Sequence, residues 1–77
     1  MSKKFIEVTV IENGREPQRS LIDIDLITTV TEIVVRVVKT DSRVNCVVTL
    51  AQDKNIQVVP VAETFNEIRN RLAAALS

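Results

Sequence analysis

Most of this chain consists of short runs in which β-branched residues alternate with polar ones. In FIEVTVIE, at residues 5–12, isoleucine or valine fills every second position from residue 6 to residue 10. This is the period of a strand that buries one face, and β-branched side chains favour extended backbone. The pattern therefore predicts a mainly β domain. The expected strands cover residues 5–12, 17–22, 26–39, 44–50 and 56–61.

Turn-forming residues separate these runs. Asn13-Gly14 is a strong hairpin signal, because both residues tolerate a positive φ. Pro17 has no N–H to give to a ladder, which suits the start of a strand. Polar turns are also expected at residues 40–45 and 52–55.

The last segment changes to the period of a helix. Thr64 and Glu67 have the spacing of a capping box, and apolar residues then recur along one helical stripe. The stripe expected at the centre of the core comprises Phe65, Ile68, Leu72 and Leu76. The predicted fold class is α+β: a small antiparallel β-meander of four to five strands with one C-terminal helix packed on the sheet.

The chain length limits how this fold is stabilised. We expect residues 1–77 to form a single domain with a small core, and domains of this size often add a disulfide, a metal or a partner subunit. One cysteine and no histidine exclude an intrachain disulfide and argue against a structural zinc site. Self-association is the stabilising device that remains.

The expected strand at residues 26–39 has two unequal faces. Residues 27, 29, 31, 33, 35 and 37 are expected to face the core. The opposite face mixes charges with valines and is too apolar for a fully solvated surface. Scattered surface valines are one explanation, and a subunit interface is the other. The candidate interface consists of Val30, Val34, Arg36 and Val38.

The charge balance bears on nucleic-acid binding. Ten basic and ten acidic residues give a formal net charge of zero, which disfavours binding by phosphate neutralisation. Aromatic residues that stack on bases are restricted to Phe5 and Phe65. A local basic patch is the alternative to ordinary solvated charges. That patch would comprise Arg36, Lys39, Arg43, Arg69 and Arg71.

Few side chains of this chain suit catalysis. The commonest general base, histidine, is missing, and Cys46 lies among apolar residues, where a thiol is usually inert. Gly14 is the only glycine, so a glycine-rich phosphate loop is excluded. We therefore expect no enzyme activity and no cofactor. An unpaired cysteine, with no signal sequence and no membrane-spanning run, indicates a cytoplasmic protein.

Asp23 and Asp25 lie two residues apart in LIDIDLITTV, at residues 21–30. On one side of a strand, two carboxylates could contribute to a divalent-metal site, although more oxygen ligands would be needed. The alternative is a corner, in which the aspartates bond nearby N–H groups and Ile24 and Ile27 point into the core. We favour the corner.

Several of these features follow one another in a recognisable order. They are a strand at residues 6–10, Asn13-Gly14, LIDIDLITTV, strands at 44–50 and 56–61, and ETFNEI at 63–68. This order resembles the FlbD-like small proteins found with bacterial flagellar and swarming genes. The resemblance implies a small cytoplasmic accessory protein and no catalytic residues.

The sequence thus predicts a small non-enzymatic accessory protein that associates with itself or with a protein partner. A regulatory protein that binds nucleic acid through the basic patch is the alternative. A metal-dependent enzyme that uses Asp23 and Asp25 is a third hypothesis, left for experiment.

Overall fold

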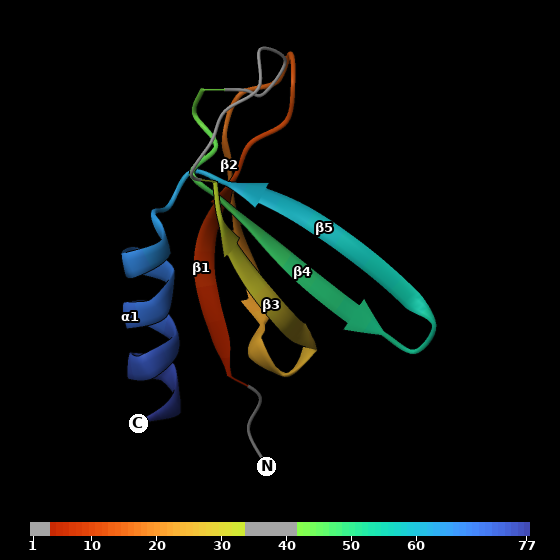
Figure 1. Ribbon diagram of the computed structural model, residues 1–77, viewed down its shortest axis with the longest axis vertical. Coiled ribbons are helices and arrows are strands. Elements are labelled where there is room, and N and C mark those ends of the chain that lie inside the picture. Colours follow the sequence, from red (N-terminus) through yellow and green to blue (C-terminus); the bar gives the residue numbers. More distant parts are fainter. Residues whose placement is uncertain (1–3, 34–41) are drawn as a thin grey trace.

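The computed structural model describes residues 4–33 and 42–77 (Figure 1). These residues form a five-stranded antiparallel sheet with one C-terminal helix packed on it, which confirms the predicted α+β class. The elements are β1 (Phe5–Val10), β2 (Gln18–Asp23), the 3₁₀ helix η1 (Ile24–Leu26), β3 (Ile27–Glu32), β4 (Cys46–Gln52), β5 (Asn55–Val61) and α1 (Phe65–Leu76).

The strand order is β2-β1-β5-β4-β3, so the sheet is not a meander in simple chain order. It joins a hairpin, β1–β2, to a three-stranded meander, β3–β4–β5. The join is short: β1 pairs with β5 at Val10 and Val61, and the Ile11 N–H donates to the Pro60 carbonyl (3.0 Å). We call this short pairing the seam. Beyond it the β4–β5 hairpin diverges from the β1–β2 hairpin, while β4 stays paired with β3 as far as Leu50 (Figure 1).

The stretch at residues 21–30 forms a corner, as predicted. β2 runs directly into η1 and then β3, although these two strands lie at opposite edges of the sheet. One short turn can join the two edges only if the sheet curls. Ile24 and Ile27 pack against the core cluster at this corner, and the Ile24 N–H donates to the Lys4 carbonyl (3.1 Å).

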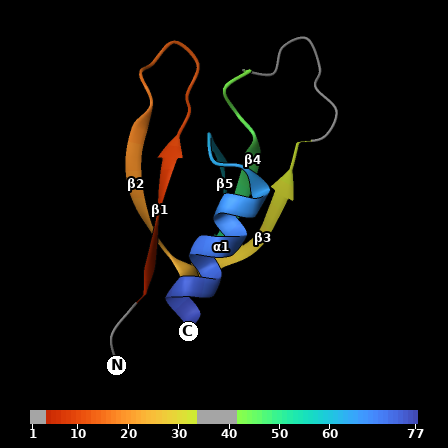
Figure 2. The same ribbon diagram turned by 90° about the vertical axis from the view of Figure 1, so that its left-hand side faces the viewer.

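The core lies inside the curled sheet, and α1 covers it between β1 and β3 (Figure 2). Ile68 is fully buried, and Phe65 and Leu72 pack against the core, as expected. Leu76 is 66% exposed, so its predicted place in the core is wrong. A helix turns by about 100° per residue, which leaves Leu76 roughly 80° away from the direction of Ile68. Ala75, only about 20° away from that direction, packs against the core instead.

Ile27 packs against the core as predicted, but the predicted faces of β3 are wrong after this residue. Val30 pairs with the buried Val48 and packs against the core, whereas Thr29 and Thr31 are exposed. The register shifts between Ile27 and Thr29, as it does at a β-bulge. A bulge reverses the alternation of faces, so Ile27 and Val30 both point inward. β3 ends at Glu32, and the remainder of the strand expected at 26–39 lies largely outside the described residues.

The two hairpin connections differ. The β1–β2 connection spans residues 11–17, and in it the Arg15 N–H donates to the Glu12 carbonyl (3.2 Å) around Asn13-Gly14. Gly14 has a φ of 74°, which a side chain would disfavour. The β4–β5 connection is a tight turn in which Asp53 has a φ of 55°.

Candidate functional site

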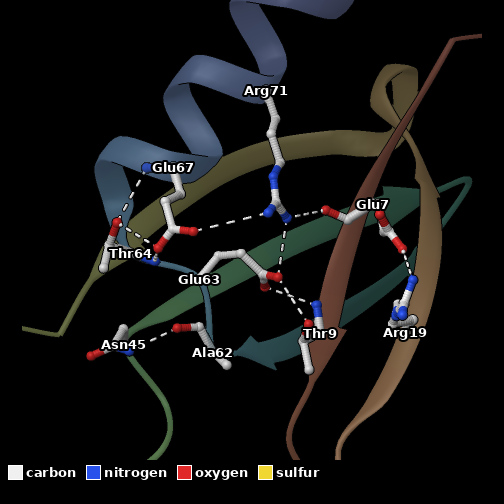
Figure 3. Close-up of polar contacts among 9 residues, drawn as sticks. All are labelled: Glu7, Thr9, Arg19, Asn45, Ala62, Glu63, Thr64, Glu67 and Arg71. Carbon is white, nitrogen blue, oxygen red and sulfur yellow. Dashed lines mark hydrogen bonds and ion pairs between the residues drawn. The ribbon is translucent and has the colours of Figure 1, made fainter.

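Next to the seam, the backbone of β1 on the side that faces β5 is hydrogen-bonded by side chains and not by a strand. Glu63 lies between β5 and α1 and is buried, with 7% of its surface exposed. Its Oε1 accepts a hydrogen bond from the Thr9 N–H (2.8 Å), and its Oε2 accepts one from the Thr9 hydroxyl (2.9 Å; Figure 3). The Ala62 N–H donates to the Thr9 carbonyl (2.9 Å), and this bond places Glu63 opposite β1.

Arg71 of α1 completes this arrangement. Its Nη1 donates to Glu63 Oε2 (3.0 Å) and to the backbone carbonyl of Glu7 in β1 (2.6 Å). Its Nη2 lies 3.9 Å from Oε2 of Glu67. We call Thr9, Glu63 and Arg71 the polar clamp, because together they tie the helix to the strand.

The start of α1 fixes the position of this clamp. The predicted capping box is confirmed: the Glu67 N–H donates to the Thr64 hydroxyl (3.2 Å), and the Thr64 N–H donates to Glu67 Oε1 (3.1 Å). Arg71 follows Glu67 by about one helical turn, so the cap also sets where its guanidinium reaches β1. Asn45, directly before β4, donates from its Nδ2 to the Ala62 carbonyl (2.7 Å; Figure 3).

The electrostatics of the clamp favour an ionised Glu63. Burial by itself raises the pKa of this carboxyl group. The hydrogen bonds from the Thr9 N–H and hydroxyl, from the backbone of Glu63 and from Arg71 outweigh that effect, so its pKa lies below the usual value for glutamate. Both oxygens accept hydrogen bonds within the protein, which suits a structural role and not that of a general base.

Cys46 is fully buried in the core, as the sequence predicted. Burial raises the pKa of its thiol, and the negative charges of Glu32, Glu63 and Glu67 raise it further. The reactive thiolate is therefore disfavoured.

The two aspartates of the corner contribute to the cap of η1 in different ways. Asp23 Oδ1 accepts a hydrogen bond from the Asp25 N–H (3.0 Å) and caps η1, so the capping role predicted for Asp23 is confirmed. Asp25 takes part in this cap through its backbone, and its side chain is exposed. Within residues 4–33 and 42–77, no three histidine, cysteine or acidic residues are grouped so that they could hold a metal ion.

The residues proposed for a basic patch have different surroundings. Arg36 and Lys39 lie outside the described residues. Arg71 belongs to the polar clamp and faces carboxylates, so its charge is already balanced. Arg43 and Arg69 are both exposed, Arg69 on a different side of α1 from Arg71. A nucleic-acid interface stays a prediction, and Arg71 is poorly placed to serve it.

Most residues of the candidate interface at residues 30–38 also lie outside the described ranges. Val34, Arg36 and Val38 are not among the described residues. Val30 is half-buried and packs against the core, so it does not lie on the outward face that the interface required.

The structure points to another apolar surface that the sequence reasoning missed. Cross-strand pairing places six uncharged residues on the side of the β4–β5 hairpin that faces away from the core. Ile56 is 74% exposed and Val58 is 58% exposed on this side. Alternation in NIQVV, at residues 55–59, was the available signal. We call this surface the outer face of the hairpin, and it consists of Val47, Thr49, Ala51, Ile56, Val58 and Pro60.

A groove of about 470 Å³ continues the outer face toward the seam. Val47 and Pro60 belong to both surfaces, and Ile11 and Val44 are buried at the base of the groove. The full lining is Ile11, Glu12, Asn13, Ile33, Val44, Val47 and Pro60. Apolar surface therefore extends from the tip of the hairpin to the seam.

Within the described part of the chain, no helix has the length and apolar character needed to cross a membrane. Comparison of the sequence with protein-family models and with curated proteins gives no match, and comparison with solved structures also gives none.

Proposed function

We propose that this chain is a small non-enzymatic interaction domain that associates with a second copy of itself through the outer face of the β4–β5 hairpin. The observation that carries the proposal is the exposure of Ile56 and Val58 side by side on this hairpin. Full burial of one such side chain contributes about 1.5–3 kcal/mol, so a complex in which a partner covers both side chains is substantially stabilised.

The chemistry of the surface supports a second copy as the partner. All six residues of the outer face are uncharged, and the formal net charge of the chain is zero. Two copies therefore meet with little electrostatic repulsion. A short chain with a small core also gains stability from a partner subunit.

The buried polar groups support a non-enzymatic role. The oxygens of Glu63 accept hydrogen bonds within the protein, and the buried Cys46 thiol has a raised pKa. The proposal includes a cytoplasmic location, which fits an unpaired cysteine, and an accessory role of the kind that the resemblance to the FlbD-like family implies.

Size-exclusion chromatography with light scattering, over a range of concentrations, tests this proposal. We expect the wild type to reach the mass of a dimer and the Val58→Lys variant to stay a monomer. Leu21→Lys is the matched control, because Leu21 is 70% exposed on the other hairpin and should leave the dimer intact. A monomeric wild type at all concentrations, or equal effects of the two substitutions, would overturn the proposal.

A further inference from the structure

Strand β5 has an open edge next to the outer face. It pairs with β4 along its whole length, but on the other side, among the described residues, it pairs with β1 only at Val61. At the seam the Pro60 carbonyl is directed toward β1. Backbone groups alternate in direction along a strand, so the N–H and C=O groups of Val58 and Ile56 are directed to this same side.

The other edges of the sheet carry features that discourage pairing, and this one does not. β2 follows Pro17 and includes the charged residues Arg19 and Asp23. β3 has a register shift near its start. Proline, charge and bulges are common ways to block an edge strand. The open half of β5, at residues 55–59, is uncharged and has neither proline nor a register shift.

We propose that a second copy of this chain pairs antiparallel with the open edge of β5, so that Ile56 of each copy lies opposite Val58 of the other. The twofold axis then passes beside Gln57. This inference rests on the proposed function and specifies how the two copies meet.

Pro60 and the hairpin turn determine this register. A pairing centred on Val58 would place Ile56 opposite Pro60, which has no N–H and whose carbonyl already accepts from Ile11. A pairing centred on Ile56 would place Val58 opposite Lys54, which lies in the turn. Centring on Gln57 lets Ile56 and Val58 of both copies use their N–H and C=O groups.

The same register brings the apolar side chains together. A twofold axis perpendicular to the sheet keeps the outer faces of both copies on one side. Ile56 and Val58 of one copy are then cross-strand neighbours of Val58 and Ile56 of the other, and apolar β-branched pairs of this kind stabilise a sheet. The backbone and the side chains thus favour one arrangement.

Disulfide trapping tests the register. In this arrangement the two copies of residue 57 form a non-hydrogen-bonded pair, with Cα atoms about 4.5 Å apart, which is within the range for a disulfide. With oxidised glutathione as oxidant, we expect the Gln57→Cys variant to form a linked dimer on non-reducing electrophoresis. Cys46 is fully buried and should not react.

Asn55→Cys is the matched control, because residue 55 is exposed in the same strand and, like residue 57, directs its backbone toward β4. In the proposed register it lies opposite Val59 of the second copy, so the two cysteines should not link. Equal linking of both variants, or no linking of Gln57→Cys while light scattering finds a dimer, would overturn the edge pairing and leave self-association standing. A monomeric wild type would overturn both the edge pairing and the proposed self-association.

Discussion

Strands β1 and β5 each meet a neighbour along only part of one side, and they differ in what covers the rest. On β1, the Thr9 N–H and the Glu7 carbonyl are bonded by Glu63 and Arg71. On β5, the pairing in the described part of the chain leaves residues 55–59 without a second neighbouring strand. Where β1 lacks a neighbouring strand, the polar clamp holds α1 to the sheet. Where β5 lacks one, backbone groups and apolar side chains stay accessible, so we expect this edge to govern association and not folding.

Removal of the clamp carboxylate is expected to have the largest effect on folding. Glu63→Ala leaves the Thr9 N–H and hydroxyl without their acceptor, whereas Arg71 loses one partner and keeps the Glu7 carbonyl. The free energy of unfolding should fall by about 2 kcal/mol, the size expected when hydrogen bonds to a charged group are lost, because Arg71 is 39% exposed and stays solvated. Urea denaturation measures this change.

Glu12→Ala is the control for that experiment. Glu12 and Arg15 form an ion pair at 3.5 Å in which both side chains are largely exposed. We expect a loss of less than about 0.5 kcal/mol. Similar losses from Glu12→Ala and Glu63→Ala would show that the clamp stabilises no more than a surface pair does.

Acid should weaken the clamp selectively. The pKa of Glu63 is lower in the folded chain than the usual value of about 4.3 that applies when the chain is unfolded. The stabilisation is therefore complete above that usual value and is lost as the pH falls through the folded pKa. The stability difference between wild type and Glu63→Gln should shrink as the pH falls below about 4.3 toward the folded pKa. A difference that stays constant over this range would exclude an ionised Glu63 as its source.

Local sequence features predicted most of the elements. Alternation located the strands, Thr64 and Glu67 located the helix start, and LIDIDLITTV located the corner. Each of these signals lies within a few residues along the chain, where backbone period and capping act directly.

The arrangement of the sheet and the clamp depended on distant residues. Thr9 and Glu63 are 54 positions apart, and no local sequence pattern predicts their hydrogen bond. A charged residue just before the helix cap, where an apolar one is common, was the only hint of the role of Glu63. The bulge in β3 likewise reversed the faces of Val30 and Thr29, because one irregular residue changes every later position.

The corner is an intermediate case between the clamp and the open edge, since a side chain bonds the backbone there but remains partly accessible. Asp23→Ala should lower the free energy of unfolding by about 1 kcal/mol, as loss of a cap does. Asp25→Ala should have less effect, because Asp25 contributes its N–H to the cap and alanine retains that group. Equal losses in urea denaturation would mean that the Asp25 side chain also supports the corner.

The smallest effect on folding is expected at the open edge. Ile56→Thr keeps a β-branched side chain at a position that is 74% exposed, so the stability of the monomer should change by less than about 0.5 kcal/mol. The dissociation constant of the dimer, from a dilution series in sedimentation equilibrium, should nevertheless rise about tenfold, because a methylene group is lost and a hydroxyl is placed at the contact. Glu63→Ala should show the opposite balance, with weaker folding and little direct effect on the contact. If Ile56→Thr destabilised the monomer as much as it weakened the dimer, the open edge of β5 would contribute to folding. The distinction between the polar clamp on β1 and the open edge of β5 would then fail.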